Sequence, residues 1–96
     1  MPLYALLGKF TQKRMETIEE LPTNIDEGME EFKKFGIELK QMLFTIGQYD
    51  VVLVVEASDD ETMSRAILSW GRRGFLKTET LRGFTPEQMI ELVKQI

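Results

Sequence analysis

The strongest constraint on this chain is the segment Val51–Glu56 (VVLVVE), whose first five residues are all apolar and are rich in β-branched side chains. Such a run favours a strand, and its length suits one that is buried. Both alternating sets of side chains are apolar here, and also in the segment Leu3–Phe10 (LYALLGKF). A sheet covered by helices on one face only should show polar residues on the other. We therefore expect a second covering layer, and a sheet from another copy of the chain is the most economical one.

Three segments show the three- and four-residue apolar spacing of amphipathic helices, at about 15–35, 58–70 and 86–96. Pro22 interrupts the first, because a proline has no N–H to donate inside a helix, so we expect a bend near Leu21–Asn24. Gly36 suits a left-handed C-terminal position. Ser58 and Glu61 predict a capping box at the start of the second helix. The last helix shows similar capping residues, Thr85-Pro86-Glu87-Gln88.

Two further segments complete the sheet. Ile37–Ile46 predicts a second strand, which the short connection Gly47–Asp50 joins to Val51–Glu56 as an antiparallel hairpin. Phe75–Phe84 predicts a fourth strand. The order β-α-β-β-α-β with right-handed crossovers predicts a ferredoxin-like α+β sandwich with a four-stranded antiparallel sheet in the order 4-1-3-2 and a C-terminal helix. With 96 residues, the chain has room for one domain, residues 1–96.

Composition excludes several kinds of chemistry. The chain has no cysteine and no histidine, so disulfides, thiolate catalysis and the usual ligands of transition metals are absent. We expect no metal and no cofactor. The formal net charge of −4 disfavours binding to nucleic acid. No apolar run is long enough to cross a membrane, and no basic stretch followed by an apolar one opens the chain, so we expect a cytoplasmic protein.

The segment Thr45–Val52 (TIGQYDVV) resembles the motif of the GYD-domain proteins, which are named for the residues found here at Gly47, Tyr49 and Asp50. The likeness covers nearly the whole chain, and its other parts are Lys9-Phe10-Thr11, Glu56–Glu61 and Thr78–Thr85. It implies a ferredoxin-like fold of the dimeric α/β-barrel kind and implies no activity. A looser likeness is to the effector-binding domains of the leucine-responsive regulators, although their helix-turn-helix is missing here.

Four residues are candidates for a ligand site: Tyr49, Asp50, Thr80 and Arg82. Tyr49 and Asp50 either serve the turn itself, through bonds to its amides and packing at the sheet edge, or line a pocket. Thr80 and Arg82 share one face of the last predicted strand, where a guanidinium suits an acidic ligand. Alternatively, Arg82 pairs with Glu79, Glu56 or a neighbouring subunit, or lies at an edge of the sheet.

These features support two functional hypotheses. The first is a non-catalytic module that self-associates, as a homodimer or larger homo-oligomer, and binds a small molecule or a protein. The alternative is a cofactor-independent enzyme of the dimeric α/β-barrel type, resembling a monooxygenase or an isomerase, which rests on analogy of fold. Without histidine or cysteine, its base would be a carboxylate or a tyrosine.

Overall fold

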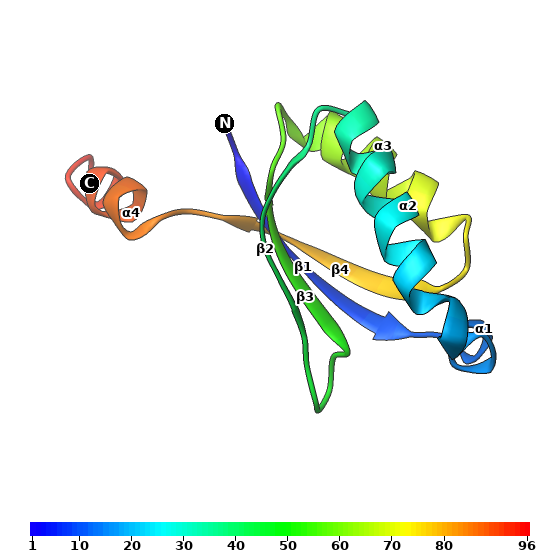
Figure 1. The fold of residues 1–96 in the computed structure, drawn as a ribbon. Helices are drawn as coiled ribbons and strands as arrows, with labels where there is room; N and C mark the ends of the chain where they lie inside the picture. The colour runs from blue at the N-terminus through cyan, green and yellow to red at the C-terminus, as the bar shows by residue number, and fades with distance from the viewer.

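The computed structural model describes all residues, 1–96, and shows an α+β fold with one sheet and a helical layer (Figure 1). The elements in chain order are β1 (Leu3–Phe10), α1 (Gln12–Glu16), the 3-10 turn η1 (Ile18–Glu20), α2 (Leu21–Lys34), β2 (Glu38–Phe44), β3 (Val51–Glu56), α3 (Asp60–Gly71), β4 (Leu76–Gly83) and α4 (Pro86–Val93). The strands are ordered β2-β3-β1-β4, and every neighbouring pair is antiparallel. This is the predicted order 4-1-3-2, so the ferredoxin-like topology is confirmed.

The core lies between the sheet and the two long helices, α2 and α3, which cover the same face of the sheet (Figure 1). Alternation along the strands decides which side chains enter it. Tyr4 and Leu6 of β1 and the odd-numbered residues of β3 point to the helices and are buried. The buried apolar set is Tyr4, Leu6, Phe32, Ile37, Val51, Leu53, Val55, Ala57, Met63 and Ala66.

The first helical segment is interrupted, as predicted, but the break lies earlier in the chain than the predicted position at Leu21–Asn24. The break falls at Thr17 and η1, and α2 is continuous from Leu21, with Pro22 in its first turn. The first N–H groups of a helix have no partner within it, so proline is tolerated there and sets a helical φ. Pro22 therefore begins a helix instead of bending one. Gly36 has φ 72° after α2, as expected for a left-handed terminus.

The capping residue of α3 also differs from the expectation. The prediction named Ser58, but the N-cap is Asp59, whose side chain accepts a 2.7 Å hydrogen bond from the Thr62 amide. The hydrogen bonds from Thr62 hold the pKa of Asp59 below its usual range. Ser58 instead donates to the Thr62 hydroxyl at 3.0 Å. At α4, the predicted capping box is present, between Thr85 and Gln88.

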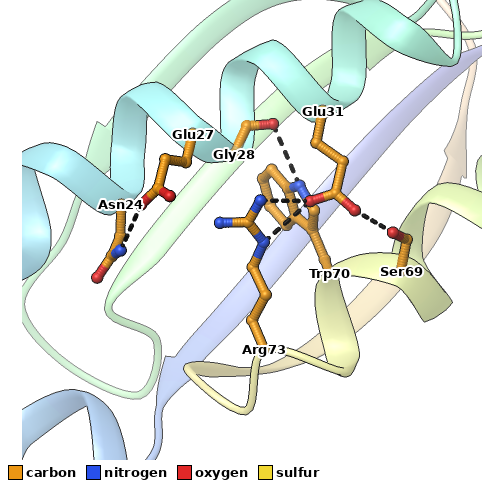
Figure 2. Close-up of polar contacts among 7 residues, drawn as sticks. All are labelled: Asn24, Glu27, Gly28, Glu31, Ser69, Trp70 and Arg73. Atoms are coloured by element: carbon orange, nitrogen blue, oxygen red, sulfur yellow. Dashed lines mark hydrogen bonds and ion pairs between the residues drawn. The ribbon is translucent and has the colours of Figure 1, made fainter.

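A polar network fixes α2 against α3 (Figure 2). Arg73, in the turn after α3, places two guanidinium nitrogens 2.8 and 2.9 Å from Oε2 of Glu31 on α2. Ser69 donates to the other oxygen of Glu31. Trp70 donates its indole N–H to the Gly28 carbonyl at 3.2 Å, and its ring stacks on Phe32 with centroids 4.0 Å apart. These contacts join the two helices into one layer.

The C-terminal helix stands apart. α4 lies at the end of an extended segment beyond the sheet, and none of its residues is buried (Figure 1). The chain measures 50 × 30 × 17 Å, with a radius of gyration of 14.6 Å. A compact domain of this length would have about 12.5 Å. Within one copy, α4 therefore does not cover the second face of the sheet.

Candidate binding surfaces

The sheet face opposite α2 and α3 has no covering layer and has an apolar centre. We call it the open face. In the strand register, the central rows run Leu43-Val52-Leu7-Glu79 and Gln41-Val54-Ala5-Leu81 across the four strands. Leu43 and Leu81 are 52% and 48% exposed, and the apolar side chains between them are half-buried by their neighbours. Continuous apolar patches on a protein surface are typical of interaction sites.

The two ends of the open face carry opposite charge. Lys9 and Lys77 are paired at the end near the β2–β3 loop. Glu38 and Glu56 are paired at the opposite end, where Lys40 lies 3.3 and 3.6 Å from their carboxylates. The first of these bonds contributes most to a raised pKa of Lys40. The face is therefore an apolar strip with a basic end and an acidic end.

The loop between β2 and β3 holds two of the four predicted site residues. Gly47 has φ 131°, a conformation that favours glycine. Asp50 accepts a 2.8 Å hydrogen bond from the Phe10 amide, so it fastens the loop to the end of β1. Tyr49 donates to Glu79 at 2.8 Å, a bond that raises the pKa of the phenol. This arrangement resembles the expected turn role, except that the amide bound by Asp50 belongs to a neighbouring strand.

The other two predicted residues line an open groove between β4 and α3. Thr80 and Arg82 are exposed there, beside Tyr4 and Asp60. The guanidinium of Arg82 lies 4.6 Å from the ring centre of Phe84 and donates to the Gly83 carbonyl. It makes no salt bridge, so the predicted pairing with Glu79 or Glu56 does not occur within one copy. The groove therefore offers an unpaired cation to an acidic group.

The structure divides the predicted site into two pairs. Thr80 and Arg82 face the helical layer, whereas Tyr49 contacts Glu79, whose side chain alternates to the open face. Within one copy, the two pairs therefore lie at different places on the sheet. The sequence analysis missed Tyr4 and Asp60, which join at 2.5 Å in the same groove as Arg82. A tyrosine within a buried strand was the available indication, because a buried phenol needs a polar partner.

No group of three or more aspartate or glutamate side chains converges where a metal ion would bind. None of the helices combines the length and the apolar character needed to cross a bilayer.

Comparison with known proteins identifies the family. Residues 4–93 match the GYD domain. A protein of Thermus thermophilus, named glutamine synthetase and cystathionine beta-lyase binding protein, is 35% identical over 95 residues, which cover 98% of this chain and 100% of the relative. No solved structure matches. With the Gly47, Tyr49 and Asp50 motif in place and the match spanning nearly the whole chain, this protein belongs to the GYD domain family.

Proposed function

We propose that this protein is a non-catalytic module that self-associates through the open face and binds other proteins. The observation that carries the proposal is the uncovered apolar centre of the sheet, formed by Ala5, Leu7, Leu43, Val52, Val54 and Leu81. Exposure of this surface to water is unfavourable, since burying apolar surface stabilises a protein or complex by about 25 cal/mol per Å². A second copy offers a face of the same shape and chemistry.

The accessible surface area of the single chain is larger than expected for a compact monomer, which supports the presence of a partner. Its accessible surface is 6480 Å², whereas a compact monomer of 11.1 kDa exposes about 5,700 Å². The excess is roughly 800 Å², the area that each partner buries in a typical stable interface. Part of it belongs to α4, whose exposed apolar residues are Met89, Ile90, Leu92 and Val93. An amphipathic helix with nothing packed against it is suited to a neighbouring copy.

The charges at the ends of the open face favour one arrangement of two copies. A two-fold axis parallel to the sheets and perpendicular to the strands places the basic end of one copy over the acidic end of the other. The alternative axis, along the strands, stacks like charges. Such complementarity fixes register more than it adds affinity. We therefore propose an antiparallel stack of two sheets.

A protein-binding role is supported by the relative in Thermus thermophilus, which is named for binding glutamine synthetase and cystathionine beta-lyase. At 35% identity, that relative aligns over its entire length with nearly the whole of this chain. The proposal extends to this chain the property of binding metabolic enzymes. Purified glutamine synthetase and cystathionine beta-lyase, each immobilised and exposed to this protein, test the extension. Absence of binding to both would remove it and leave self-association alone.

Self-association is tested with two matched double variants. Leu43→Lys with Leu81→Lys places two charges on the open face, at side chains that are already 52% and 48% exposed. Met15→Lys with Leu68→Lys changes two side chains of similar exposure, 58% and 71%, outside that face. Sedimentation velocity should show the wild type and the control pair as dimers or larger assemblies and the open-face pair as a monomer. A monomeric wild type would overturn the proposal.

A further inference from the structure

A second feature of the molecule lies inside the fold, between α2 and the sheet. A cavity of about 80 Å³ separates them and opens toward solvent. Most of its wall is apolar, including Ile25, Met29, Met42 and Leu53. For scale, an apolar protein cavity of about 150 Å³ holds one benzene molecule. The space therefore suits a chain of roughly three or four carbon atoms, with further room toward the opening.

One wall of the cavity contains a buried charge. Arg14 on α1 is only 1% exposed. Its Nη1 donates to Oδ1 of Asn24 at 2.9 Å, and its Nη2 donates to the carbonyl and hydroxyl of Thr17 at 2.7 and 3.3 Å. The guanidinium carbon lies 4.3 Å from the centre of the Phe75 ring. Every partner of this cation is thus neutral.

Arg14 is also incompletely bonded. Its Nε–H is buried and has no acceptor, and it is the only side-chain nitrogen or oxygen of the protein in that condition. No carboxylate lies within salt-bridge distance of Arg14. A buried charge without a counter-ion, or a buried donor without an acceptor, is costly. The Nε–H of Arg14 therefore lacks one acceptor.

The surrounding charges favour an anion as well. Lys13 lies 5.0 Å from the Phe75 ring, on the outer side of the same segment. Arg73 borders the cavity and is paired with Glu31, so this pair is neutral overall. Thr78 adds a hydroxyl group to the wall. The cavity is therefore apolar at its centre and positive at the side where Arg14 lies.

We propose that this cavity binds a small monocarboxylate with a short apolar chain. One carboxylate oxygen accepts the free Nε–H of Arg14, and the chain packs among Met29, Met42 and Leu53. Charge-assisted bonds of this type are about twice as strong as neutral ones. The proposal goes beyond the protein-binding role and does not depend on it, because the cavity lies behind the sheet from the open face.

The direct test observes the Arg14 Nε–H group itself. Its ¹H–¹⁵N NMR signal, assigned through the side-chain carbons of Arg14, is followed while butyrate or its neutral isostere butyramide is added. We expect a saturable downfield shift with butyrate and little change with butyramide. No shift with butyrate would overturn the proposal, and equal shifts would overturn the assignment of the ligand as a carboxylate.

A pair of variants separates the buried cation from its exposed neighbour. Arg14→Met removes the charge and leaves an unbranched apolar side chain in its place. Lys13→Met removes a nearby charge outside the cavity. By calorimetry, Arg14→Met should weaken butyrate binding about tenfold or more, the equivalent of at least ~1.4 kcal/mol. Lys13→Met should change it less than about threefold. Equal losses in both variants would indicate general attraction of anions and overturn the site.

Discussion

The phenol of Tyr4 on β1 donates a 2.5 Å hydrogen bond to Oδ1 of Asp60, the first residue of α3. This bond joins residues 56 positions apart and ties the start of α3 to the sheet. Tyr4 is itself buried, at 3% exposure. Burial and the neighbouring carboxylate raise the pKa of Tyr4 from 10.0 to about 12, so the phenol remains a donor throughout the physiological range.

Replacing Tyr4 with phenylalanine removes this bond and keeps the ring in the core. A hydrogen bond to a charged group contributes about 1.5–3 kcal/mol, so Tyr4→Phe should lower the free energy of unfolding by roughly that amount in urea denaturation. Tyr49→Phe is the matched control, because its bond to Glu79 is on the surface and should contribute less than about 1 kcal/mol. Equal effects of the two variants would show that the Tyr4 bond has no special structural role.

The raised pKa of Tyr4 also makes stability depend on alkaline pH. The unfolded chain releases this proton near pH 10 and the folded one near pH 12. A raised pKa in the folded state adds stability below the unfolded value, and this stability is lost as pH rises from about 10 to 12. Urea midpoints should therefore fall across that window in the wild type and fall less in Tyr4→Phe. In ultraviolet difference absorbance of the phenolate, Tyr4 should ionise near pH 12; ionisation near pH 10 would contradict the prediction.

The bond between Glu31 and Arg73 allows a direct measurement of how α2 is held to α3. Both side chains are partly buried, at 16% and 32% exposure, and Ser69 shares the same carboxylate. We expect a double-mutant cycle of Glu31→Gln and Arg73→Met to give a coupling free energy of about 1 kcal/mol. The exposed pair Lys33–Glu30, with its nitrogen and oxygen 3.4 Å apart, should give about 0.3 kcal/mol. A coupling near zero for Glu31 and Arg73 would mean that packing alone fixes the helices.

The fold was largely predictable because its determinants are local. The apolar side chains on both faces of Val51–Glu56 predict a strand. Gly36 predicts the end of α2, and the capping box at Thr85 predicts the start of α4. Each signal depends only on residues that are close together in the sequence. The bend was predicted at the wrong position because a proline such as Pro22 suits either a bend or the start of a helix. Which of the two occurs depends on how the preceding chain packs. Asp59 and Ser58 are both good caps, and spacing alone does not separate them.

The candidate sites were less predictable because they depend on which faces the strands present. Thr80 and Arg82 were correctly assigned to one face, since alternation is a property of the strand itself. Their separation from Tyr49 depends on which face of β4 turns toward the helices, and the predicted strand order does not fix that face. Arg14 gave no indication at all: in the sequence it is one of two adjacent cations at a helix start, and only the packing of Phe75 and Asn24 buries it.

Replacing each of two glycines with alanine should change the stability of the protein in opposite directions. Gly36 has φ 72° and open space around it, so Gly36→Ala introduces only backbone strain and should cost roughly 1–2 kcal/mol. Gly71, the last residue of α3, also has open space but lacks a positive φ. Gly71→Ala should therefore gain up to about 1 kcal/mol through its helix propensity. Thermal unfolding of the two variants provides the measurement, and a loss in Gly71→Ala would show an unrecognised constraint there.

The proposed antiparallel stack predicts that two charge reversals, one at each end of the open face, compensate each other. General destabilisation of the fold would not give this result. Lys77→Glu should weaken the assembly because it places a carboxylate at the end of the open face that lies over the acidic end of the second copy, and like charges across an interface repel. Glu38→Lys should weaken it in the same way. The double variant exchanges the two ends and should restore association to near the wild-type level, as measured by sedimentation equilibrium at low salt. Additive weakening in the double variant would exclude this axis, because the basic and acidic ends would then not face each other.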